Sequence, residues 1–412
     1  MIFVQRNYIK NYMKQLISSF LFIPFCLLLQ AQEISDTKFG NGMINFIAKD
    51  SSFSVKFAPR IQSRYQSKWS YDGEDYDPAD INFSVRRARL KFGGFAFSPK
   101  LKYKIELGLS NRDISGANVY NRNTPRYILD AVVMWNFYEN FELWAGQTKL
   151  PGNIERVVSS ANLQLIDRSL LNSKFNIDRD MGIHLRHKLR LGGNWIIKEK
   201  FSISQGEGRN ITEGNIGGLQ YTSRLELLPF GEFSSKGDYF QGDLKREKSI
   251  KAMFGFTYDI NENAVKSRSN MGSYLIQSSG GLFETDITTI FLDGVIKYNG
   301  FALTGEYANR DADQIEALEE DGKTKTGAVV GAGSASNIQG SYLFKNNFEI
   351  TARYTNINFK KITRLSDLKQ ITFGVSKYIV GHSLKIQADI SLLNASGIKD
   401  NVLFRTGFDL HF

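Results

Sequence analysis

The sequence ends in Arg405-Thr406-Gly407-Phe408-Asp409-Leu410-His411-Phe412, a stretch in which apolar and polar residues alternate. Successive side chains of a β-strand point to opposite faces, so Phe408, Leu410 and Phe412 share one face and polar residues occupy the other. A strand of an outer-membrane β-barrel needs this pattern, because one face meets lipid and the other a watery lumen. A soluble strand can alternate in the same way, so the rest of the chain must decide.

The N-terminal segment has the pattern of an export signal. Arg6, Lys10 and Lys14 precede an apolar stretch over 16–29, which Gln30-Ala31-Gln32 follows. We predict a secretory signal peptide over residues 1–31 and a short periplasmic segment over 32–50. The alternative, a membrane-anchoring helix, is disfavoured because the stretch is short for a span and Pro24 interrupts it. The single cysteine of the chain, Cys26, lies inside the predicted signal.

The net charge of the chain gives little information about what the protein binds. Removal of the three basic signal residues from a formal charge of +10 leaves +7. A basic exported protein can bind an anionic surface or nucleic acid, but it can equally guide small anions through a pore. After the signal, the apolar runs are no longer than a strand, so any membrane crossing must be made by a closed β-barrel.

The chain after residue 50 divides into alternating segments bounded by Gly, Asn, Asp and Pro. We predict sixteen strands in an antiparallel transmembrane barrel over 51–412, at approximately 52–68, 81–97, 101–112, 126–138, 141–150, 179–189, 195–205, 219–229, 250–261, 286–298, 301–310, 337–345, 348–359, 368–379, 384–394 and 401–412.

The connections between these segments alternate in length. Even-numbered strands lead into tight turns and odd-numbered strands mostly into long polar loops, which is the pattern of outer-membrane barrels. The linker over 230–249 is an exception, because it is long and charged but falls on the side of the short turns. A β-sandwich would show similar alternation. It gives no reason, however, for the charge on nearly every polar face or for aromatic residues at strand ends.

Two strands carry irregularities. Pro59 lies within the first strand, where a closed barrel has no free edge, and predicts a bulge or a late strand start. In the second strand, Arg87, Arg89 and Lys91 share parity with apolar residues, which predicts either a bulge or contact of this strand with a neighbouring subunit.

The segment from Gly146 to Gly182 narrows the family. It contains Gly146-Gln147-Thr148-Lys149-Leu150-Pro151-Gly152, Leu165-Ile166-Asp167-Arg168 and Arg179-Asp180-Met181-Gly182. With Arg86-Arg87-Ala88-Arg89-Leu90, Leu228-Pro229-Phe230-Gly231 and Gly237-Asp238-Tyr239-Phe240, this segment resembles the phosphate-selective porin O and P family. The resemblance implies a sixteen-stranded barrel, usually trimeric, whose third long loop, here 151–178, folds inward as a constriction.

Basic residues of this loop region and of the lumen face are the candidate pore and anion-binding residues. Charges in a narrow, partly dehydrated passage attract anions and repel cations. The loop region contributes Arg156, Arg168, Lys174 and Arg179, and the predicted lumen face contributes Arg60, Arg64, Lys102, Lys104 and Arg186. Alternatively, Arg156 and Arg168 pair with Glu155, Asp167 and barrel carboxylates and so only pin the loop. The excess of basic over acidic lumen residues is small.

Enzymatic motifs are missing from the sequence. His184 and His187 would face opposite sides of a strand, which makes a poor metal site. No Gly-x-Ser-x-Gly elbow is present. We therefore predict no enzyme activity, no cofactor and no metal.

The sequence favours an outer-membrane porin for passive diffusion of small hydrophilic solutes, preferring anions such as phosphate. A plugged structural or adhesive barrel and a barrel hydrolase are the alternatives. The expected partners are outer-membrane lipid, lipopolysaccharide, two further copies in a homotrimer, and the barrel-assembly machinery through the strand ending in Phe412. The acidic residues Glu316, Glu319, Glu320 and Asp321 could bind divalent ions or bridge lipopolysaccharide, but a solvated charge run is favoured. Nucleic acid is not expected.

Overall fold

The computed structural model describes residues 39–71, 73–114, 116–213, 216–396 and 398–412. Phe39–Phe412 forms one compact unit. The predicted signal peptide over 1–31 lies outside the described residues, as does the first part of the segment over 32–50.

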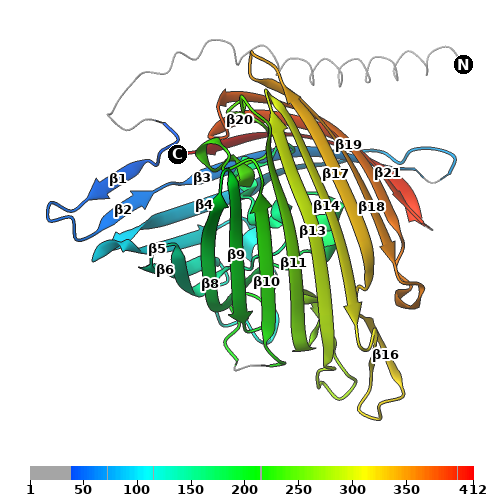
Figure 1. Ribbon diagram of the computed structural model, residues 1–412. Helices are drawn as coiled ribbons and strands as arrows, with labels where there is room; N and C mark the ends of the chain where they lie inside the picture. The colour runs from blue at the N-terminus through cyan, green and yellow to red at the C-terminus, as the bar shows by residue number, and fades with distance from the viewer. Residues whose placement is uncertain (1–38, 72, 115, 214–215, 397) are drawn as a thin grey trace, which may run out of the picture. The chain divides into compact units, whose positions relative to one another are not determined.

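Sixteen antiparallel strands within the described residues form a closed barrel (Figure 1). Each strand pairs with the next, and the last pairs with the first through twelve Cα partners from Asp400↔Tyr71 to His411↔Arg60. The strands are β3 (Arg60–Tyr71), β4 (Asp80–Ala96), β5 (Ser98–Gly108), β6 (Ile128–Tyr138), β7 (Phe141–Lys149), β8 (Arg179–Gly192), β9 (Trp195–Ser204), β10 (Gln220–Leu228), β11 (Lys251–Ala264), β13 (Thr285–Tyr298), β14 (Phe301–Ala312), β17 (Gly333–Leu343), β18 (Phe348–Phe359), β19 (Leu368–Val380), β20 (Leu384–Ala395) and β21 (Ile398–His411). The predicted fold class and strand count are confirmed.

Shorter elements lie in the connections. The long connections hold the hairpin of β15 (Glu316–Leu318) and β16 (Lys325–Val329), strand β12 (Lys266–Tyr274), helix α2 (Asn111–Ile114) and the 3-10 turn η4 (Lys361–Thr363). Most connections at the opposite end of the barrel are tight turns, such as Asn299-Gly300 between β13 and β14. Among the described residues, no helix is long and apolar enough to cross a membrane.

Both predicted irregularities are present. The first segment is divided at Pro59, so that the barrel strand β3 starts late, at Arg60. The preceding β2 (Ser54–Phe57) pairs instead with β1 (Ile44–Ile47) and with the end of β4. In β4 the register with β3 shifts between Gln62↔Arg87 and Ser63↔Val85, so Arg86 is the extra residue of a bulge. The bulge turns Arg86 and Arg87 inward, whereas Phe83 and Val85 remain exposed on the outer face.

Outward-facing and inward-facing side chains alternate along the barrel strands. On β13, for example, Ile290 and Leu292 face outward, while Phe291 and Asp293 are buried inside. Most inward positions carry polar or charged side chains that are buried against segments filling the barrel. The lumen is therefore occupied by protein over much of its wall, and the occupying segments come from both ends.

The connection between β10 and β11, at residues 229–250, is the exceptional linker noted in the sequence. It contains the turn η3 (Ser234–Tyr239) and folds into the barrel from the end that carries the short turns. We call it the turn-side insert. Lys297 Nζ on β13 donates to the carbonyl oxygens of Gly237, Phe240 and Gly242 at 2.7, 2.8 and 2.5 Å, which holds the insert against the wall.

Candidate functional site: the constriction loop and its wall

The connection between β7 and β8, residues 150–178, folds into the barrel as the resemblance implied. We call it the constriction loop. It holds α3 (Ile154–Val157), η2 (Ser160–Asn162) and α4 (Leu170–Phe175). The side chains of Ser159 and Ser169 accept hydrogen bonds from the backbone N–H groups of Ala161 and Asn172, which caps the latter two elements.

Apolar side chains of the constriction loop pack on one half of the wall. Leu171, Phe175 and Ile177 form a buried cluster with residues of β13, β14, β17 and β18. Ile154, Val158 and Leu163 form another with Phe233 of the turn-side insert and with residues of β9, β10, β11 and β13. Burial of these side chains removes apolar surface from water and keeps the loop on this half of the barrel.

Three wall carboxylates bind the loop backbone. Asp293 on β13 accepts from Ile154 N at 3.1 Å, and Glu306 on β14 accepts from Glu155 N at 2.6 Å. Asp389 on β20 accepts from Ile166 N at 3.2 Å. Because these carboxylates are engaged with the loop, they do not present a free negative charge to a solute.

Wall cations bind the carbonyl oxygens of the same loop. Arg60 donates to Ser160 O at 3.0 Å, Arg224 to Gly152 O at 3.0 Å, and Lys385 to Ala161 O at 2.9 Å. Arg310 donates to the carbonyl oxygens of Lys174 and Phe175. Each buried guanidinium or ammonium group thereby satisfies loop carbonyls that have no strand or helix partner.

Asp167, at the tip of the loop, is the loop carboxylate with the largest number of arginine side chains around it. It lies 2.6 Å from Arg86, 2.8 Å from Arg64, 3.5 Å from Arg405 and 3.6 Å from Arg87. Burial alone would raise the pKa of Asp167, but these four guanidinium groups hold it well below its usual range. The carboxylate is therefore ionised and ties the loop to β3, β4 and β21.

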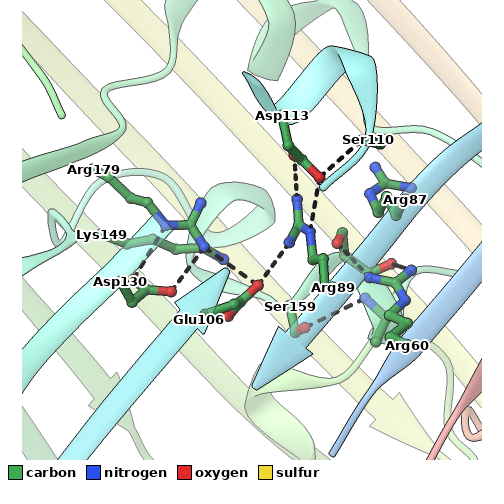
Figure 2. Close-up of polar contacts among 12 residues, drawn as sticks. Arg60, Arg87, Arg89, Glu106, Ser110, Asp113, Asp130, Lys149, Ser159 and Arg179 are labelled. Carbon is green, nitrogen blue, oxygen red and sulfur yellow. Dashed lines mark hydrogen bonds and ion pairs between the residues drawn. The ribbon is translucent and has the colours of Figure 1, made fainter. Parts of the chain in front are cut away.

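A second network links β4, β5, β6 and β8 beside the loop (Figure 2). Arg89 lies 2.9 Å from both Asp113 and Glu106, and Arg179 lies 3.0 Å from Asp130. Lys104 bridges Asp130 at 2.8 Å and Glu106 at 3.1 Å. Cations and carboxylates alternate in this network, so most of its charge is balanced internally.

Lys149, Arg156 and Arg168 organise the first turn of the loop. Lys149 Nζ donates to the carbonyl oxygens of residues 156, 157 and 158, and Arg168 donates to those of residues 155 and 158. Arg156 Nε donates to Asp178 at 2.6 Å, which fastens the start of the loop to its end.

The wall formed by β5 to β8 carries inward-facing side chains without such contacts to the loop. Lys102 is exposed, and among the described residues it makes no hydrogen bond or ion pair. Arg186 is partly exposed and lies over the indole of Trp144, with 3.5 Å between its Cζ atom and the ring centroid. Lys102, Met134, Trp144 and Arg186 keep exposed surface, so we call this part of the wall, which water and solutes can reach, the accessible wall. Other inward side chains of these strands, such as Asp130, Gln147 and His184, are buried.

A comparison with protein families matches residues 59–391 to the family described as phosphate-selective porin O and P. The chain belongs to this family. Membership and the closed barrel place the protein in the outer membrane of a Gram-negative bacterium. An uncharacterized protein of Aquifex aeolicus (strain VF5) is 26% identical over 358 residues, which cover 80% of each chain.

Solved porins and channels share the fold at low identity. The anion-selective porin from Comamonas acidovorans has a TM-score of 0.51 and 13% identity, covering 87% of this chain and 100% of that one. The outer membrane channel DcaP of Acinetobacter baumannii has a TM-score of 0.53 and 12% identity, covering 89% and 99%. The trimer form of OmpT of Vibrio cholerae has a TM-score of 0.50 and 13% identity, covering 88% and 100%. At these identities the likeness shows the fold alone.

The candidate residues predicted from sequence fall into two groups in this porin. Six engage protein partners, at the loop or in the network beside it: Arg60, Arg64, Lys104, Arg156, Arg168 and Arg179. Among the described residues, the side chains of Lys102, Lys174 and Arg186 make no hydrogen bond or ion pair. Instead of the carboxylates considered from sequence, Arg156 pairs with Asp178 and Arg168 with loop carbonyls.

Lys149 and Asp167 belong to the motif that carries the family resemblance, and this place in the motif is the one sequence signal for them. Spacing along the chain does not reveal their partners, which for Asp167 lie far away in the sequence. Arg86 and Arg87 were hidden by the bulge, which breaks the alternation that identifies inward positions.

Proposed function

We propose that this protein is a porin for passive diffusion of small hydrophilic solutes that prefers anions, with phosphate among them. One observation carries the proposal. The wall carboxylates Asp293, Glu306 and Asp389 are occupied by loop N–H groups, whereas Lys102 and Arg186 on the accessible wall form no ion pair within the described residues. Positive charges that no carboxylate binds favour anions in a narrow passage.

The test is the reversal potential of single channels in a planar bilayer under a potassium chloride gradient. We expect the wild type to prefer chloride and Lys102→Glu to shift the potential toward cation preference. Lys323→Glu, on an exposed outer loop, is the matched control, because water screens its charge. Equal shifts in the two variants would contradict a role for this wall. Replacement of chloride by phosphate then measures whether phosphate is selected.

A plugged structural barrel is a second candidate function. The turn-side insert and the constriction loop enter from opposite ends and meet, with Gln241 N donating to Asn162 O at 2.9 Å and Gln164 N donating to Gln241 Oε1 at 2.9 Å. Steady conductance of the purified wild type would exclude this candidate, and its lack would exclude the porin.

The family and the fold point to a channel and not to an enzyme. We further propose export by the signal over 1–31 and assembly as a homotrimer. The trimer proposal rests on the sequence resemblance, and the printed description of one structural neighbour names a trimer form of that neighbour. Cross-linking of intact outer membranes tests the trimer.

A further inference from the structure

The accessible wall carries an apolar strip between positive charges. Lys102 on β5, Met134 on β6, Trp144 on β7, His184 on β8 and Ser202 on β9 are successive cross-strand partners. Strands lie about 4.8 Å apart, so the row runs roughly 19 Å around the lumen. Met134 and Trp144, which follow Lys102 in this row, carry a thioether and an indole, although lumen positions of such barrels are usually polar.

Trp144 is held in place at both its edge and its face. Its Nε1 atom donates to Glu142 Oε2 at 2.9 Å, and the Arg186 guanidinium covers one face at 3.5 Å. The Glu142 carboxylate faces Arg186 across the strands but is engaged with the indole and forms no ion pair with Arg186. The ring is therefore a prearranged flat surface with a guanidinium group stacked on it.

Polar atoms beside this surface have no protein partner. His184 is 1% exposed and Ser202 is fully buried, and neither the ring nitrogens of His184 nor Ser202 Oγ forms a hydrogen bond within the described structure. The Nε atom of Arg186 is also buried without a partner. The Nε atoms of Arg64 and Arg353 also lack a partner, but those two guanidinium groups bind Asp167 through their Nη1 atoms, whereas Arg186 binds no carboxylate or carbonyl oxygen among the described residues.

We propose that Trp144, Arg186 and Met134 form a binding site for organic carboxylates that carry an apolar ring. The carboxylate binds the fork of the Arg186 guanidinium in bidentate fashion, and the ring lies along the Trp144 and Met134 side chains. Lys102, at the other end of the strip, attracts the anion toward it. This inference rests on the proposed porin function and adds a solute class to it. Inorganic anions have no apolar ring, so at this site they would gain only electrostatic attraction to the positive charges.

Block of single-channel chloride current by benzoate tests the site, with acetate as the ringless comparison. We expect benzoate to block the wild type at concentrations at which acetate does not. Trp144→Ala and Arg186→Gln should each weaken the benzoate block by roughly tenfold, the size expected from loss of a ring contact or a charge-assisted hydrogen-bond pair. Trp135→Ala, which removes an outward-facing indole on β6, should leave the block unchanged.

The outcomes separate the two proposals. A wild type without conductance or without anion preference overturns the porin proposal itself. An anion-preferring wild type that benzoate and acetate block equally overturns the ring site alone, as does an unchanged benzoate block in Arg186→Gln. If Trp144→Ala does not assemble, Trp144→Phe decides: it should keep a weaker block with the order benzoate over acetate, and loss of that order without loss of conductance also overturns the site.

Discussion

Asp167, at the tip of the constriction loop, lies 2.6 Å from Arg86, the extra residue of the β4 bulge. Arg64 and Arg405 reach the same carboxylate from β3 and β21. Replacement Asp167→Asn leaves these guanidinium groups without their shared counter-charge. We expect a loss of about 2 kcal/mol of stability, which is less than for a fully buried pair because the Asp167 side chain retains 14% exposure. The unfolding temperature on heat-modifiability gels measures the loss.

The control for that variant is Asp311→Asn. Asp311 pairs with Lys360 where both side chains are about half exposed, at 50% and 43%. Such pairs contribute little, so its unfolding temperature should match the wild type. Equal losses from both variants would contradict the special position of Asp167.

The pH dependence of the loop follows from the same carboxylate. The pKa of Asp167 is held below its unfolded value, so the stabilisation is present above the ordinary Asp pKa and is lost only as the pH falls through the lowered value. Between pH 7 and about pH 4, the range above the ordinary Asp pKa, we expect Asp167 to contribute no step in the conductance, so that any step there persists in Asp167→Asn. Titration of single-channel conductance in both proteins checks this, and a step between pH 5 and 4 that Asp167→Asn abolishes would argue against it.

Gly374 on β19 allows the loop to approach the wall. A Cβ atom there would lie 2.3 Å from Leu165 Cδ2 of the constriction loop. Gly374→Val should displace the loop toward the accessible wall, lower the conductance and cost about 1–3 kcal/mol from overpacking. Gly305→Val on β14 is the control, because its Cβ meets no described atom within 4 Å. Single-channel conductance that is identical in both variants would mean that this contact does not set the passage width.

Lys297 fixes the turn-side insert through three carbonyl oxygens. In Lys297→Met these hydrogen bonds are lost, at about 0.5–1.5 kcal/mol each, and the insert gains freedom to move. We expect noisier single-channel current and faster proteolysis within 229–250. Lys377→Met, which removes an exposed bond to Asn346 O in a short turn, should change neither.

The free-energy cost of a charged substitution on the outer face depends on its depth in the membrane. Leu292, near the middle of β13, and Tyr298, at its end, are both about half exposed, at 49% and 47%. Arginine costs roughly 2–4 kcal/mol at the bilayer midplane but 0–1 kcal/mol near the interface. Leu292→Arg should therefore reduce the amount of folded protein in the outer membrane much more than Tyr298→Arg. Quantitative immunoblots of membrane fractions give the comparison, and equal amounts would place the hydrophobic band elsewhere.

Sequence alone predicted the strands well because period-2 alternation is strong where one face meets lipid. Pro59 and the parity of Arg87 and Arg89 also pointed to the late start of β3 and the bulge in β4. What the sequence could not show is which inward charges bind the loop. Arg60 and Lys102 have the same alternation signal, yet Arg60 reaches Ser160 and Lys102 stays exposed. That difference depends on the path of residues 150–178, which have no periodicity.

The turn-side insert shows the same limit. Its length and charge were evident at 230–249, but its inward fold depends on Lys297 and on Gln241, which lies far along the chain from its partners Gln164 and Gln339. Similarly, the apolar strip becomes visible only once the register aligns Met134 with Trp144.

The seam between β3 and β21 has a consequence for assembly. Arg60 and Asp409, 349 residues apart, form an ion pair across it at 2.6 Å, and Arg60 also binds the constriction loop. Contacts between such distant parts of a chain form late, because the long intervening segment must first be ordered. Closure of the barrel and anchoring of the constriction loop therefore occur together. A barrel that has not closed holds the loop only loosely and has no defined pore.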